Sequence, residues 1–139
     1  MTEMNPTTTC ARILLLSALV LAAGCGSEDD DTAALCSSVD SLKTSVSGLT
    51  DITIDKNALT DLQARLDQVQ TDLGEVKDDA SDKYATEIDA VDQAASTVGS
   101  TLDQAISTPS VQAASAVGTA VQSLGTSLKT LADAVKGTC

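Results

Sequence analysis

Four cysteines, Cys10, Cys25, Cys36 and Cys139, are the side chains of this 139-residue sequence with the widest choice of chemistry. A thiol can be acylated, can form a disulfide, can bind a metal or can act as a nucleophile. The last two are disfavoured because the chain has no histidine and no pair of cysteines in CxxC spacing. We therefore expect no catalytic residue, no metal site and no cofactor.

Cys25 stands at the end of an apolar run. Residues 13–23 are almost wholly apolar and follow Arg12. Eleven helical residues span about 16 Å, which is too short for the ~30 Å hydrocarbon core of a bilayer. Residues 1–24 are therefore predicted to be a signal peptide and not a transmembrane helix.

The sequence Leu-Ala-Ala-Gly-Cys at residues 21–25 resembles the lipobox of bacterial lipoproteins. The resemblance implies that Cys25 is the first residue of the mature protein and carries a lipid, with palmitate among its acyl chains. It also implies anchoring to the outer face of a bacterial membrane, within the cell envelope. A secretory signal without lipid would show similar small residues before its cleavage site, and remains the alternative.

Cys36 and Cys139 lie near the two ends of the remaining chain. In an exported protein such a pair is expected to be a disulfide. The bond would close nearly the whole domain into one loop, which the chain-entropy model values at about 4–5 kcal/mol.

The charge of the chain is strongly acidic, at -12. Such a surface repels nucleic acid, so we expect no nucleic-acid partner. Residues 25–32 include a run of acids and are predicted to be an extended tether, and residues 33–139 to be one helical domain. Tyr84 is the only aromatic residue, so the core must consist of Leu, Val, Ile and Ala.

Apolar residues recur at steps of three and four, which is the period of a helix. The first stripe is Leu35, Val39, Leu42, Val46 and Leu49. The second is Leu59, Leu62, Leu66, Val69, Leu73, Val76, Ala80, Tyr84, Ile88, Val91, Ala95, Val98, Leu102 and Ile106. The third is Val111, Ala114, Val117, Val121, Leu124, Leu128, Leu131 and Val135. Residues 50–55 are expected to be a loop that packs Ile52 and Ile54 on the bundle, and Pro109 separates the last two helices.

Two all-α architectures fit these stripes. In the preferred one, residues 57–106 form a long central helix, flanked by two shorter antiparallel helices in a thin coiled coil. In the alternative, the chain turns at residues 78–82 and makes an up-down-up-down four-helix bundle. The first is preferred because the stripes are narrow, whereas a four-helix core uses about three apolar positions in seven. Either bundle would be closed by the disulfide.

Gly99, Gly118 and Gly125 each follow an apolar stripe residue. Glycine costs about 1 kcal/mol inside a helix. One hypothesis is that these glycines allow helices to approach closely, so that alanine in their place would not stabilise the protein. The alternative is drift in a sequence rich in Ala, Ser, Thr and Gly.

The carboxylate pairs Asp78/Asp82, Asp89/Asp92 and Asp61/Asp67 fall on exposed helix faces, where they lack the desolvated cleft that acid–base catalysis requires. We expect a non-enzymatic, lipid-anchored envelope protein, similar in type to murein-lipoprotein-like coiled coils, that acts as a structural or partner-binding helical module. Its partners would be the membrane and an envelope protein that the sequence does not identify. A carrier of an apolar ligand or lipid, or a secreted helical factor without lipid, are the alternatives.

Overall fold

The computed structural model describes residues 27–53 and 57–139, and the side chains from residue 30 onward within that range. Its helices are α1 (Ser27–Thr50), α2 (Ala58–Asp79), α3 (Ala85–Ser107) and α4 (Val111–Val135), with a short 3-10 turn, η1 (Asp82–Tyr84), between α2 and α3. No strand occurs in the described ranges. The compact unit is Asp31–Cys139.

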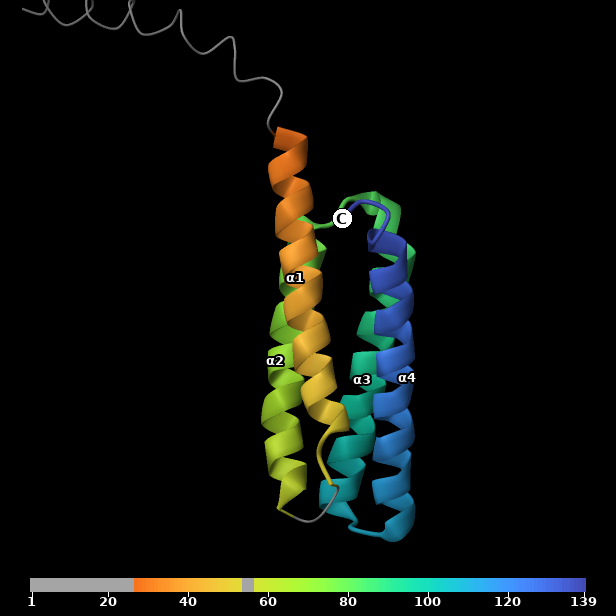
Figure 1. Ribbon diagram of the computed structural model, residues 1–139. Helices are drawn as coiled ribbons and strands as arrows, with labels where there is room; N and C mark the ends of the chain where they lie inside the picture. The colour runs from red at the N-terminus through yellow and green to blue at the C-terminus, as the bar shows by residue number, and fades with distance from the viewer. Residues whose placement is uncertain (1–26, 54–56) are drawn as a thin grey trace, which may run out of the picture. The chain divides into compact units, whose positions relative to one another are not determined.

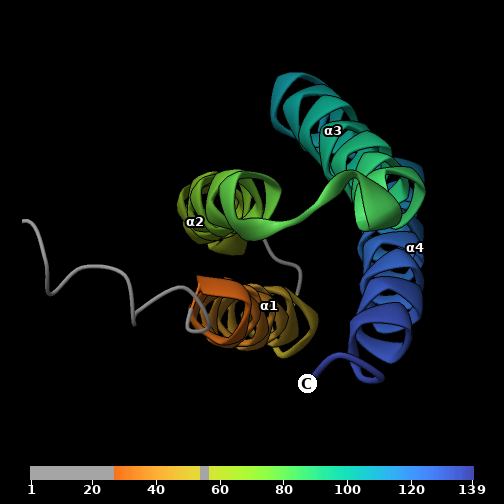
Figure 2. The ribbon, with the colours of Figure 1, turned by 90° about the horizontal axis from the view of Figure 1, so that it is seen from above.

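Within this unit, successive helices run in opposite directions (Figure 1). Viewed along the helices, α1 lies beside α2 and α3 beside α4 (Figure 2). Hydrogen bonds and a disulfide, described below, join α1 to α2 and to α4. The expected all-α antiparallel bundle closed by a disulfide is therefore confirmed, in the form of an up-down-up-down four-helix bundle.

The preferred long central helix is wrong, because α2 and α3 are separate helices. The backbone is extended at Ala80 (φ -83°, ψ 140°) and at Ser81 (φ -77°, ψ 163°). Asp78 and Asp79 lie at the negative end of the α2 dipole, which disfavours acids there. Asp78 and Asp82 would also repel each other four residues apart on a continuous helix. This acidic stretch therefore ends α2 instead of being carried through it.

The core is wider than the predicted apolar stripes, because small and polar residues complete it. Ser38, Asp72, Ala105 and Ala120 are all buried, beside the Leu and Val stripe residues. Ser38, Asp72 and Ala120 each fill the third core position that a helix in a four-helix bundle needs. A pattern that counts only large apolar residues reads these positions as surface.

Most residues of the predicted stripes are buried, whereas Ala80 and Ala114 are half-buried and two residues at helix ends are exposed. Ile106 is 43% exposed and Val111 is 83% exposed, so their assignment to the core is wrong. Ala105 is buried in place of Ile106. Ile52 packs on the core as expected, and Ile54 lies outside the described residues.

The ends of the helices also differ from those expected. Residues 27–32 form the first turns of α1 instead of an extended tether, since acids are favoured at the positive end of a helix. α4 begins after Ser110, whose side chain accepts a hydrogen bond from the backbone N–H of Ala113 at 3.0 Å.

Two of the helical glycines do not mark close helix contacts, so the close-approach hypothesis is wrong for them. A Cβ built on Gly125 meets nothing within 4 Å, and one on Gly99 meets Leu66 Cδ2 at an ordinary 3.5 Å. Gly125→Ala should therefore raise the free energy of unfolding by about 0.5–1 kcal/mol, because alanine is the better helix former. Gly74→Ala, at an equally open site in α2, is expected to do the same. Thermal melting followed by circular dichroism measures both, and a lowered melting temperature in either variant would contradict the described packing.

Candidate functional site

Cys36 of α1 and Cys139, which follows α4, form a disulfide with a Cα–Cα distance of 5.9 Å. The C-terminal tail is turned toward α1 by backbone hydrogen bonds from Thr138 and Cys139 to the carbonyl of Val135, at 2.7 and 3.1 Å. The bridge closes a loop across 103 residues. It joins the first helix of the bundle to the last.

Tyr84 also binds the C-terminal tail. Its ring is buried, and its hydroxyl hydrogen-bonds to the hydroxyl of Thr138, next to Cys139. Lys83 Nζ lies 5.0 Å from the centre of the Tyr84 ring, a cation–π geometry. The hydrogen bond with Thr138 is the main cause that lowers the pKa of Tyr84 below 10.0, and Lys83 adds to it. The expected packing role of Tyr84 is confirmed, and a tether to the tail is added to it.

A groove of about 380 Å³ lies between α1 and α4. Its lining residues come from the last third of α1 and the second half of α4: Lys43, Val46, Ser47, Thr50, Gly125, Leu128, Lys129, Ala132 and Asp133. Val46 and Leu128 also belong to the buried core, so the groove is floored by the core itself. Because Gly125 has no side chain, the groove is open at this position of α4.

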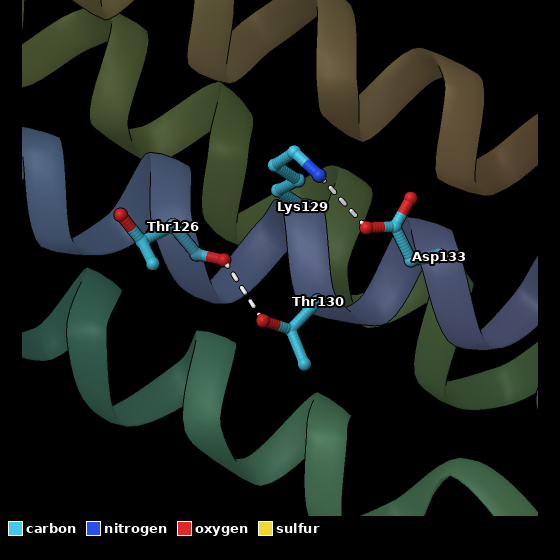
Figure 3. Close-up of polar contacts among 4 residues, drawn as sticks. All are labelled: Thr126, Lys129, Thr130 and Asp133. Carbon is cyan, nitrogen blue, oxygen red and sulfur yellow. Dashed lines mark hydrogen bonds and ion pairs between the residues drawn. The ribbon is translucent and has the colours of Figure 1, made fainter.

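The charged side chains of α4 in this groove interact with each other. Lys129 Nζ donates to Asp133 Oδ2 at 2.9 Å, one helical turn on (Figure 3). Their hydrogen bond raises the pKa of Lys129 and lowers that of Asp133. Lys136 and Lys43 also lower the pKa of Asp133 through their charges. The hydroxyl of Thr130, on another side of α4, donates to the carbonyl of Thr126 and is thus satisfied within the helix (Figure 3).

The interface between α1 and α2 contains two buried or half-buried carboxylates. Ser38 Oγ donates to Asp79 Oδ2 at 2.5 Å. One heptad further along, Ser45 Oγ donates to Asp72, which is only 6% exposed and also accepts from Gln68 Nε2 at 2.8 Å. Since every buried side-chain N and O atom in the described residues has a partner, these carboxylates are satisfied. Their repeat every seven residues fixes the register of α1 against α2, because a shift would leave charge unpaired.

The residues predicted from the sequence fall in different places. Cys36 and Cys139 are brought together, whereas Cys10 and Cys25 lie outside the described residues. The three carboxylate pairs lie on the outside of the helices, apart from the half-buried Asp92, which pairs with Lys77 at 3.1 Å. Within the described residues, no group of three or more Cys, Asp or Glu is placed to hold a metal ion. None of the described helices is long and apolar enough to cross a membrane.

The α1–α4 groove and the buried Asp72 were both missed by sequence reasoning. Asp72 gives one usable signal, since it lies three residues after Val69 on the core side of α2. The groove gives none, because its lysines are brought together only when α1 and α4 pack. Comparison with protein-family models, with curated proteins and with solved structures found no match for this chain.

Proposed function

We propose that this chain is a lipid-anchored protein of the bacterial cell envelope, whose helical domain is a structural or partner-binding module without catalytic activity. The observation that carries the proposal is the disulfide between Cys36 and Cys139. Disulfides persist in oxidising compartments, which agrees with export. The lipobox-like residues 21–25 then supply the route to the membrane through Cys25.

The construction of the bundle also favours a passive, positional role. Its core is continuous through all four helices, and its buried polar side chains are satisfied by one another. The disulfide restricts opening between α1 and α4. Such a domain suits a stable module held at a membrane surface more than one that opens during a reaction cycle.

Metabolic labelling with an alkyne-bearing palmitate in a bacterial host tests the anchor. The wild-type chain should take up label, and Cys25→Ala should take up none and lose its membrane association, because the acceptor sulfur is gone. Cys10→Ala is the matched control, since it removes a cysteine expected to leave with the signal peptide, and it should label normally.

Other results of this labelling experiment would contradict the anchor. Label that persists in Cys25→Ala, or its absence from the wild-type chain, would contradict the anchor. An unlabelled chain that is still exported would identify a secreted factor instead. The carrier function is a second candidate because of the α1–α4 groove.

A further inference from the structure

We infer that the α1–α4 groove is a binding site for a fatty-acid anion, with the carboxylate held near Lys43 and Lys129 and the acyl chain lying toward Gly125. This site is made by the folded bundle alone. It does not depend on whether Cys25 carries a lipid.

The charge of the groove differs in sign from that of the chain. The whole chain carries a formal charge of -12, whereas two lysines and one aspartate line the groove. A third lysine, Lys136, is close enough to lower the pKa of Asp133. Among the described residues, neither Lys43 nor Lys136 forms an ion pair. The face therefore has unpaired positive charge that an anion can neutralise.

The polarity of the groove changes along its length. Because α1 and α4 are antiparallel and joined at Cys36 and Cys139, Lys43 lies across from the Asp133 region. Thr50 correspondingly lies across from Gly125. Lys43 and the Nζ atom of Lys129, which lies 2.9 Å from Asp133 Oδ2, are thus on the disulfide-proximal side of the groove. The distal end has only hydroxyl groups and Gly125 beside its apolar floor. A ligand with one anionic end and one apolar chain matches this order.

The dimensions suit a single short chain. The groove volume of about 380 Å³ is within the range of about 300–1,000 Å³ found for small-molecule sites. The seven-residue span from Lys43 to Thr50 is about 10 Å long at 1.5 Å per residue. The floor is formed by Val46, Leu128 and Ala132, which offer no buried hydrogen-bonding group that an acyl chain would leave unpaired.

Photolabelling with a decanoate that carries a diazirine on its chain tests the site. The probe is added to the full chain in nanodiscs of a zwitterionic phospholipid, and labelled residues are mapped by peptide mass spectrometry. Labels should concentrate on residues 43–50 and 125–133, because those segments enclose the chain. A matching decyl trimethylammonium probe should label them at least about tenfold less, since its head repels the lysines; tenfold corresponds to about 1.4 kcal/mol.

Two glycine variants form a matched pair. Gly125→Leu places a side chain in the groove and should reduce groove labelling at least tenfold. Gly74→Leu has the same chemistry at an equally open position of α2 outside the groove, and should label like wild type. Thermal melts of both variants report whether each is folded.

Charge variants give effects of opposite sign. Lys43→Gln should weaken labelling several-fold, because it removes a cation that has no ion-pair partner among the described residues. Asp133→Asn should strengthen labelling several-fold, because it removes the acid that competes for Lys129.

The inference is overturned if Gly125→Leu labels like wild type, if labels spread evenly over α2 and α3, or if the cationic probe labels the groove equally well. The same mapping on Cys25→Ala separates this inference from the anchor. Groove labelling that persists in Cys25→Ala, which carries no lipid, supports the fatty-acid site whether or not the wild-type chain is anchored. Groove labelling that is lost only in Cys25→Ala contradicts the fatty-acid site.

Discussion

Replacing Cys36 and Cys139 together with serine is expected to lower the free energy of unfolding by about 4–5 kcal/mol. The bridge spans 103 residues, and the loss of so long a loop constraint gives the unfolded chain more conformational freedom. Equilibrium denaturation in urea, followed by circular dichroism at 222 nm, measures the change. Reduction of the wild-type protein should cause the same loss, and reduction of the double variant should cause none. A double variant as stable as wild type would mean that the two cysteines do not form this bond in the protein.

The same experiment has an optical reporter at the bridge. Tyr84 is the only tyrosine, and its pKa lies below 10.0 mainly because of its hydrogen bond with Thr138. Reduction frees the tail that carries Thr138, so the Tyr84 pKa should rise toward 10.0. In the folded, oxidised state, ionisation of Tyr84 stabilises the fold as the pH rises through the lowered pKa of this residue. This contribution to stability should shrink on reduction. Alkaline titration of tyrosinate absorbance detects the change, and an unchanged titration curve would contradict the contact between Tyr84 and the tail.

Leu102→Ala is expected to lower the free energy of unfolding by about 3–5 kcal/mol, because it leaves a cavity in a closely packed core. Leu102 is 1% exposed between α3 and its neighbours. Ile106→Ala, one turn later on the same helix, should cost less than about 0.5–1 kcal/mol, because that side chain is 43% exposed. Urea denaturation of the two variants measures the difference.

This pair of residues tests the end of α3 directly. The sequence pattern places both residues in one apolar stripe, whereas the structure turns Ala105 to the core instead of Ile106. Equal losses of unfolding free energy in the two variants would mean that Ile106 is a core residue, and would contradict the described packing. Ile106→Val, which keeps most of the side chain, is the conservative control and should be close to wild type.

The sequence predicted the parts of the fold that depend on a regular period. Apart from Val111 at the start of α4, the leucines and valines of α1, α2 and α4 that repeat at three and four residues are buried, as expected. The disulfide was also predictable, since it follows from two cysteines near the ends of a domain that is expected to be exported. These features depend on the spacing and number of particular residues along the chain, so one sequence is sufficient to find them.

The features that were missed depend on how the helices meet. The sequence allows a turn at residues 78–82, where the backbone is extended at Ala80 and Ser81, but the narrow stripes favour a continuous helix. Small and polar core residues such as Ser38 and Asp72 widen the core without any signal in an apolar pattern. The lysines of the groove come from helices at opposite ends of the chain, so only the folded bundle places them together.

We propose that the disulfide-closed bundle is exported and is anchored to a membrane through the sulfur of Cys25. The intact mass of the protein isolated from a bacterial envelope, recorded before and after reduction, tests both halves of this claim. We predict a chain that starts at residue 25, carries the added mass of acyl groups on its first residue, and gains two hydrogens on reduction. A chain of unmodified mass at its first residue, or one whose mass does not change on reduction, would contradict it.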